Sequence, residues 1–281
     1  MVRTQRAALL VSLAVFLIAA VVYFTTLTPT VPFWDSGEFI AVSYILGIPH
    51  PPGTPFYVLL GRIATLVPWA SVAQRVNGLS ALASALAVWL TFLTALKLVR
   101  LAQGRERKPS DEWIALAAAF AGTLLLAFSD SFWENSIEAE VYSLMSLAQI
   151  LVLWLGLNWW EAHEKKPTVG PLLVCVYVMW LCVGLHLGVG IMGLPLIVLV
   201  WLVDRKVALL FAMPFLSVLS VVKGLEFMAG GVLALTFAVL TVFTMRKQIN
   251  GWVWFCCLGG ALVGLVIAFG DKDFTWPTAL V

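Results

Sequence analysis

Long apolar runs separated by short polar loops repeat along most of the chain. Each run has about the length of a bilayer crossing, which takes roughly 17–25 residues of α-helix. The pattern therefore predicts an all-α protein with about nine transmembrane helices, and it shows no internal repeat and no soluble domain. Glycines and a proline in Gly188–Pro195 leave the end of the fifth run and the start of the sixth poorly defined. The predicted spans are Ala8–Leu27, Val76–Leu98, Trp113–Phe128, Tyr142–Trp160, Val169–Leu187, Gly188–Val203, Val207–Val222, Phe227–Thr244 and Trp252–Phe269.

The segment between the first two spans, residues 28–75, is too long and too patterned for a simple tether. Asp35–Gly47 predicts a short helix, with an apolar stripe of Phe39, Val42, Ile45 and Leu46. The run His50-Pro51-Pro52-Gly53 then breaks the chain. A second short amphipathic helix is predicted at Pro55–Leu66. Helices of this kind lie in the membrane interface rather than crossing it.

The composition agrees with a membrane protein and narrows the functional classes. Hydrophobic residues make up 62% of the 281 residues, and the mean hydropathy is +0.99, far above the norm for soluble domains. The net charge is +2, and the basic residues are dispersed over short loops. The charge therefore does not indicate a nucleic-acid-binding surface. The four cysteines lie inside apolar runs and are interpreted as small hydrophobic residues. We therefore expect a single transmembrane domain over residues 1–281, which we interpret as a fragment or short form of a longer protein.

The basic residues predict the orientation in the membrane. With a cytoplasmic N-terminus, thirteen of the 17 lysines and arginines fall inside and four, Arg62, Arg75, Lys223 and Lys272, fall outside. This asymmetry follows the positive-inside rule. The same topology places most acidic residues of the loops outside, and the first span is interpreted as an uncleaved anchor.

The stretch Trp34-Asp35-Ser36-Gly37-Glu38-Phe39 carries the candidate chemistry. Asp35 and Glu38 are three residues apart on the predicted helix, so both carboxylates project from one face near its start. Carboxylates beside hydrocarbon are costly and tend to be functional or paired. The alternative is structural, because a helix start favours acidic residues and Asp35 can cap it.

These residues also carry a family resemblance. The first outer loop, with His50-Pro51-Pro52-Gly53-Thr54-Pro55 after the acidic pair, resembles the GT-C superfamily of polyprenyl-phosphate-dependent glycosyltransferases. Within it, the chain is similar to a bacterial membrane family related to the animal transmembrane O-mannosyltransferases. Phe132-Trp133-Glu134 through Glu140-Val141-Tyr142 resembles the second outer loop of that family, and Gly184-Leu185-His186 is a weaker match.

The resemblance implies transfer of a sugar from a polyprenyl-phosphate carrier to a protein or glycan acceptor, with mannose as one candidate sugar. The site then lies on the extracytoplasmic face of a bacterial inner membrane. Asp35 is expected as the general base and Glu38 as the second catalytic carboxylate. No cofactor is expected, and a divalent metal is disfavoured because the leaving group is a lipid phosphate. The expected substrate-binding residues are Trp34, His50, Arg62, Arg75, Glu138, Glu140, Tyr142 and His186.

Other interpretations stay open at this stage. Arg62 and Arg75 could either contact the phosphate or anchor the chain at the membrane interface. Trp34 and Trp133 could either stack on a sugar ring or belong to an aromatic belt at the interface. A lipid-linked sugar transporter or flippase also fits polytopic helices interrupted by Gly and Pro. The acidic residues gather at one face, however, which favours a surface enzyme over a two-sided carrier. A non-catalytic membrane scaffold is the third alternative.

Overall fold

The computed structural model describes residues 2–51, 53–104, 106 and 108–208, and every regular element among them is helical. The all-α prediction is thus confirmed for this part of the chain. The residues fall into two compact units. The first comprises Met1–Trp159 with Gly170–Met192, and the second comprises Trp160–Val169 and the described residues from Gly193 onward. The predicted spans Val207–Val222, Phe227–Thr244 and Trp252–Phe269 lie outside the described residues, apart from Val207 and Ala208.

Among the described residues, four helices are long and apolar enough to cross a membrane, which supports a polytopic membrane protein. They are α1 (Val2–Thr25), α4 (Val72–Ala102), α5 (Pro109–Ala127) and α7 (Val141–Lys165). α1, α4 and α5 share one buried core, in which small alanines let the helix backbones approach closely. Ala85 and Phe92 of α4 are fully buried there, as is Val15 of α1.

Capping residues explain where two of the long helices begin. Ser71 caps α4: its hydroxyl accepts the backbone N–H of Gln74, and the Gln74 side chain accepts the N–H of Ser71 in return. α5 begins at Pro109, which suits the first helical position because proline lacks an N–H and has its φ preset.

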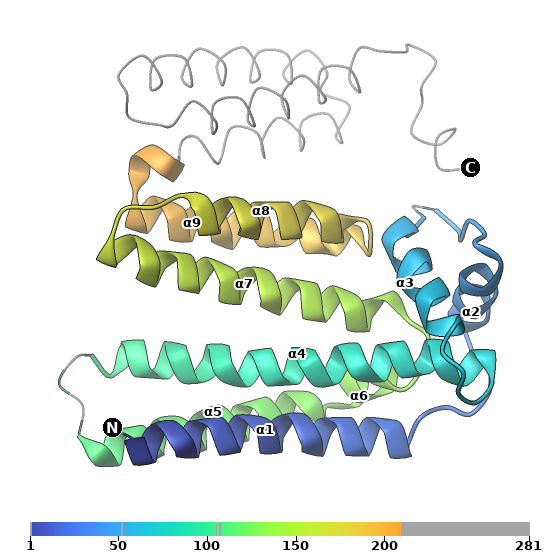
Figure 1. The fold of residues 1–281 in the computed structure, drawn as a ribbon, viewed down its shortest axis with the longest axis horizontal. Helices are drawn as coiled ribbons and strands as arrows, with labels where there is room; N and C mark the ends of the chain where they lie inside the picture. The colour runs from blue at the N-terminus through green and yellow to red at the C-terminus, as the bar shows by residue number, and fades with distance from the viewer. Residues whose placement is uncertain (1, 52, 105, 107, 209–281) are drawn as a thin grey trace, which may run out of the picture. The chain divides into compact units, whose positions relative to one another are not determined.

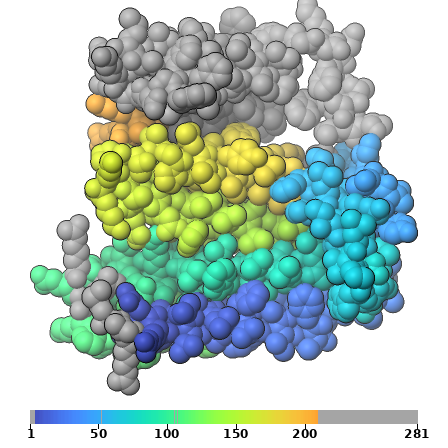
Figure 2. Space-filling model, viewed as in Figure 1, coloured from blue at the N-terminus to red at the C-terminus, as the bar shows by residue number. Residues whose placement is uncertain are grey.

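The segment after α1 forms two short helices, α2 (Ser36–Ile45) and α3 (Pro55–Thr65), as the sequence predicts. Figure 2 shows their residues gathered at one end of the first unit. The helices cross closely at Gly61, where an added Cβ would lie only 2.1 Å from Ser43 Oγ. Of the predicted apolar stripe, Phe39 and Val42 are buried, whereas Ile45 and Leu46 are 71% and 54% exposed. Leu46 has a positive φ that ends α2, and this turn directs both side chains outward.

The segment between α5 and α7 meets the segment between α1 and α4 at the same end of the unit. It contains the short helix α6 (Asp130–Ser136). The Tyr23 hydroxyl at the end of α1 donates to the Ala127 carbonyl, at 2.8 Å, where α5 ends. The Thr28 N–H donates to Ile137 O at 3.1 Å, and the Asn77 amide donates to Thr28 O at 2.8 Å. These bonds hold both loops against the start of α4.

The predicted spans Val169–Leu187 and Gly188–Val203 are shorter in the structure. In the first unit, α8 (Gly170–Val183) has 14 residues and is followed by a turn and the 3-10 helix η1 (Leu187–Met192). In the second unit, α9 (Gly193–Val203) has 11 residues. Glycines at 184, 188 and 190 explain the interruption, because glycine is a poor helix former. The break therefore begins four residues before the predicted boundary.

Candidate functional site

His50 connects the two carboxylates of the first outer loop. Its backbone N–H donates to Glu38 Oε1 at 2.7 Å, and its ring Nδ1 lies 2.6 Å from Glu38 Oε2. The other ring nitrogen, Nε2, lies 4.0 Å from Asp35 Oδ2. Asp35, Glu38 and His50 form the acidic cluster, and the Asp35 side chain remains 59% exposed.

Local backbone geometry positions this cluster. Trp34 has a φ of +63°, a left-handed conformation that costs a non-glycine residue about 1–2 kcal/mol. It turns the chain into α2 with Asp35 at the N-cap position, but the Asp35 side chain makes no capping hydrogen bond. The carboxylate is therefore not used by the helix start. The Gly53 N–H donates to His50 O at 2.9 Å, and the Phe39 ring packs 5.8 Å from the His50 ring. These contacts hold His50 close to the start of α2.

The hydrogen bond between His50 and Glu38 shifts both protonation equilibria. It lowers the pKa of Glu38 below its ordinary value and raises the pKa of His50 above its own. Burial opposes both shifts, while the charge of Asp35 adds to the rise at His50. The pair therefore favours an imidazolium that lies between two carboxylates.

Glu140 brings a third carboxylate from the second outer loop. It is only 6% exposed, and Ser80 of α4 holds its backbone through contacts of 3.4 and 3.5 Å. Burial raises the pKa of Glu140 to about 7, with the charges of Glu138 and Asp35 adding to the rise and the nearby Ser36 hydroxyl opposing it. The charges of Asp35 and Glu138 thus both act on this buried carboxyl.

Two buried hydroxyls surround Glu140. Ser36 and Tyr57 are both fully buried. The Tyr57 hydroxyl has no hydrogen-bond partner among the described residues, and the Ser36 hydroxyl makes no well-formed bond there but lies close enough to Glu140 to lower its pKa. Burial and the charge of Glu140 both raise the pKa of the Tyr57 hydroxyl. Neither residue is among the predicted site residues, although Ser36 lies within the Trp34–Phe39 motif and Tyr57 within the second predicted short helix. Unpartnered buried hydroxyls are uncommon in proteins, so they add donors to the site beyond the predicted residues.

The two arginines of the first loop bind backbone carbonyls. The Arg75 guanidinium donates to Trp69 O, to Thr65 O at 2.8 Å and to Ala70 O at 2.9 Å. It thus stabilises the turn between α3 and α4. Arg62 donates to Tyr44 O at 2.6 Å and lies over the Tyr44 ring, so it ties α3 to the end of α2.

The remaining predicted residues lie in different surroundings. Trp34 is 91% exposed, whereas Trp133 is tied to Thr26 through its indole N–H. The Tyr142 ring lies 5.6 Å from the His186 ring, which brings the second loop together with the Gly184–His186 turn. That turn also contacts α3, because Gly184 O accepts the Phe56 N–H at 3.0 Å. Burial and the charge of Glu134 raise the pKa of Glu138, which lies beside the site.

The acidic cluster also has the composition of a cation site. Asp35, Glu38 and His50 each offer one ligand atom, and these atoms lie within 4.8 Å of one another. Carboxylate oxygens and imidazole nitrogens are ligands for Zn²⁺ and Mn²⁺. In this arrangement, however, Glu38 and His50 already hydrogen-bond to each other at 2.6 Å. A cation here would have to replace that bond.

Comparison with known families places these residues in one domain. The sequence model of the N-terminal domain of the protein O-mannosyl-transferase TMEM260 matches residues 35–210. The chain belongs to this family. The match to the TMEM260 N-terminal domain begins at Asp35 and includes all the predicted site residues except Trp34, so the resemblance found in the sequence is confirmed.

Two TMEM260 relatives are similar over about half of the chain. The protein O-mannosyl-transferase TMEM260 of Mus musculus is 38% identical over 160 residues, which cover 55% of this chain and 20% of the mouse protein. The protein O-mannosyl-transferase tmem260 of Dictyostelium discoideum is 28% identical over 144 residues, which cover 50% of this chain and 16% of that protein. The chain thus matches a fifth or less of the length of these relatives. No solved structure matches.

Proposed function

We propose that the protein is a membrane glycosyltransferase that moves mannose from a polyprenyl-phosphate carrier to a hydroxyl group of a protein, at the extracytoplasmic face. The observation that supports it best is the convergence of Asp35, Glu38, His50 and the buried Glu140 at one end of the first unit. Membership of the TMEM260 family, whose relatives are named protein O-mannosyl-transferases, supports the reaction class.

The cluster suits the chemistry of this transfer. An acceptor hydroxyl is a weak nucleophile and needs a general base within hydrogen-bond reach. In the proposed step the exposed Asp35 carboxylate takes the hydroxyl proton as the acceptor oxygen bonds to the anomeric carbon. The bond from that carbon to the phosphate oxygen breaks, and the polyprenyl phosphate leaves with the electron pair. Nearby carboxylates stabilise the positive charge that develops on the sugar ring, as in glycoside hydrolysis.

His50 supplies the cation for this step. The pair with Glu38 favours its charged form, and Nε2 lies on the Asp35 side of the ring. An imidazolium there attracts the leaving phosphate without a metal ion. Glu38 is then a positioning residue, because it fixes the orientation of the His50 ring through Nδ1.

The decisive test is Asp35→Asn in the full chain, purified in detergent or nanodiscs. Asparagine keeps the shape of the side chain but cannot accept the proton, so transfer should fall by about 10²–10⁴-fold. Binding of the donor and thermal unfolding should remain as in the parent. Asp130→Asn, an exposed acid on α6 at the same end, is the matched control and should stay active. If Asp35→Asn turns over within a few-fold of the parent, Asp35 is not the base.

The orientation is tested separately with an impermeant thiol reagent in intact cells. A cysteine at Trp34, which is 91% exposed, should be labelled because residues 34–55 are proposed to be extracytoplasmic, and a cysteine at the exposed Lys165 should be protected. The basis is the distribution of lysines and arginines. The reverse labelling pattern would place the acidic cluster on the cytoplasmic side and contradict the proposed site.

A further inference from the structure

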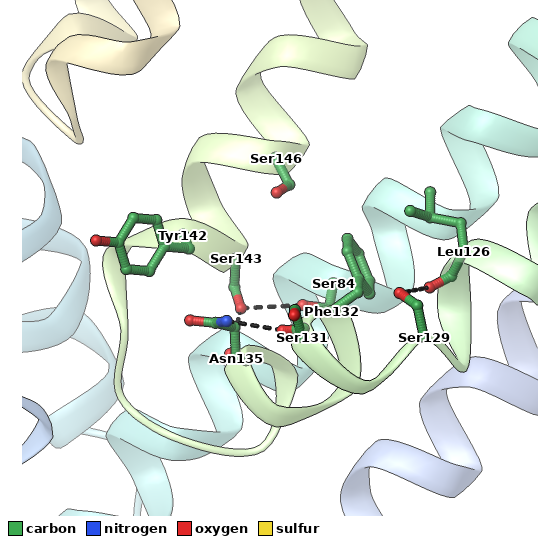
Figure 3. A pocket seen from close by; sticks show the side chains of 9 residues that line it. All are labelled: Ser84, Leu126, Ser129, Ser131, Phe132, Asn135, Tyr142, Ser143 and Ser146. Carbon is green, nitrogen blue, oxygen red and sulfur yellow. Dashed lines mark hydrogen bonds between the residues drawn. The ribbon is translucent and has the colours of Figure 1, made fainter. Parts of the chain in front are cut away.

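A pocket of about 340 Å³ shares no residue with the acidic cluster. It lies among α4, α6, α7 and the turn between α5 and α6, all in the first unit (Figure 3). Five of its nine lining residues are serines, and none of the nine is charged. We call it the serine pocket; its serines are Ser84, Ser129, Ser131, Ser143 and Ser146.

Hydrogen bonds fix one wall of the serine pocket. Ser84 Oγ donates to Ser143 Oγ at 3.0 Å, and Ser143 Oγ donates to Asn135 O at 2.6 Å. Both serines are at least 98% buried. The Asn135 amide donates one N–H to Ser131 O at 2.7 Å, which leaves its second N–H and its oxygen for a ligand. The hydroxyls of Ser131 and Ser146 bond to no other residue in the described part of the chain.

This lining selects the class of ligand. With no lysine or arginine the pocket offers no charge to a phosphate, and with no carboxylate it offers none to an amine. Hydroxyl and carboxamide groups suit a neutral ligand with many hydroxyls, and the face of Phe132 suits its apolar C–H side. The volume lies near the lower end of the range of about 300–1,000 Å³ for small-molecule pockets. A single sugar ring fits these requirements better than a peptide.

The chain places the serine pocket next to Glu140. Ser80, which contacts the Glu140 backbone, and Ser84, which lines the pocket, are one helical turn apart on α4. Ser143 likewise follows Glu140 by three residues at the start of α7. One turn advances a helix by about 5.4 Å, so the pocket begins about one turn beyond the contact between Ser80 and the Glu140 backbone.

We propose that the serine pocket binds the hexose ring of the lipid-linked donor, an inference that rests on the proposed function. The hydroxyls of the sugar bond to Asn135, Ser131 and Ser146, and Phe132 packs against the ring. The anomeric carbon points toward the acidic residues, and the phosphate stays outside the uncharged lining. The pocket therefore recognises the sugar, while the carrier is recognised elsewhere.

The test compares two probes, farnesyl phosphate and mannosyl-phosphofarnesol, bound to the full-length protein in detergent. The parent should bind the mannosylated probe more tightly. Ser146→Leu fills the pocket from α7, and leucine suits a helix. It should reduce the preference for the mannosylated probe by about tenfold, the loss expected for two or three hydrogen bonds, while the affinity for farnesyl phosphate is unchanged. Ser110→Leu, the same change at an exposed serine outside the pocket, should alter neither affinity.

The outcomes separate this inference from the proposed function. If Ser146→Leu and Ser131→Leu both still prefer the mannosylated probe over farnesyl phosphate, the serine pocket does not bind the sugar. Transfer by the parent would in that case still support the proposed enzyme. If the parent binds neither lipid probe, the proposed donor is wrong, and methyl α-mannoside followed by saturation-transfer NMR tests the pocket alone. A mannoside signal that Ser146→Leu abolishes supports the pocket, and an unchanged or absent signal overturns it. Ser131→Leu decides the comparison if Ser146→Leu does not fold.

Discussion

His50 Nδ1 and Glu38 Oε2 lie 2.6 Å apart across a turn that separates the two residues by twelve positions. The same carboxylate accepts the His50 backbone N–H through its other oxygen. Glu38 therefore fixes both the position and the ring orientation of His50. The arrangement resembles a carboxylate–imidazole pair of hydrolases in geometry, although here the second ring nitrogen faces a carboxylate.

Glu38→Gln should lower the pKa of His50, because the mutation removes the negative charge that stabilises the imidazolium. The folded-state pKa of His50 is raised, so its charged form contributes stability at low pH and that contribution disappears as pH rises through the raised pKa. NMR titration of the imidazole signals measures the shift, with His50→Asn to assign the signal among the three histidines. An unchanged His50 titration in Glu38→Gln would show that the pair does not form in solution.

Arg75→Lys should destabilise the fold more than it weakens donor binding. Lysine keeps the charge but cannot reach the carbonyls of Thr65, Trp69 and Ala70 with one rigid fork. We expect a loss of about 1–3 kcal/mol in unfolding free energy, the usual cost of unpaired backbone acceptors. Arg62→Lys, which breaks one such bond, is the milder comparison. If Arg75→Lys unfolds like the parent but binds farnesyl phosphate at least tenfold more weakly, Arg75 is a phosphate ligand.

Chelation should leave transfer unaffected. Two of the three candidate ligands, Glu38 and His50, are already hydrogen-bonded to each other. The proposed leaving group is a single lipid phosphate. Transfer measured with and without EDTA should agree within about twofold, against the 10²-fold scale of losing a catalytic group. Loss of activity with EDTA that Mn²⁺ or Mg²⁺ restores would instead assign the acidic cluster as a metal site.

The elements of the first outer loop could be predicted from sequence, but their contacts could not. α2 and α3 begin within one residue of the predicted positions, because Pro55 and the Trp34–Asp35 start are strong local signals. The partnership of His50 with Glu38 depends on how the chain turns through 49–53, which proline content alone does not specify. Arg75 looked like a free cation because nothing in the sequence shows that its guanidinium meets three carbonyls.

The serine pocket shows a second limit of sequence reasoning. Its residues come from α4, from α6 with the turn before it, and from α7, at no fixed spacing. Serines in apolar helices also commonly bond to the backbone of their own helix, as Ser12 of α1 does to Leu9 O at 2.8 Å. Only the packing of three helices shows that five of them line one space.

The buried carboxyl of Glu140 should make the protein less stable as pH rises. Its pKa is raised from 4.5 to about 7 by burial and by the charges of Glu138 and Asp35. Between these values the folded state holds a proton that the unfolded state has lost, so stability falls through this window and the penalty is complete above about pH 7. At about 1.4 kcal/mol for each unit of pKa shift, the penalty is up to about 3 kcal/mol.

Glu140→Gln removes this charge and keeps the shape, so it should unfold at a higher temperature than the parent at about pH 8 and close to the parent at about pH 5. The control Glu106→Gln, at an exposed position between α4 and α5, should not change the pH dependence. Thermal unfolding over this pH range measures both. Parallel curves for Glu140→Gln and the parent would mean that Glu140 titrates as an ordinary exposed carboxyl. Such a result would remove the buried carboxyl from the site.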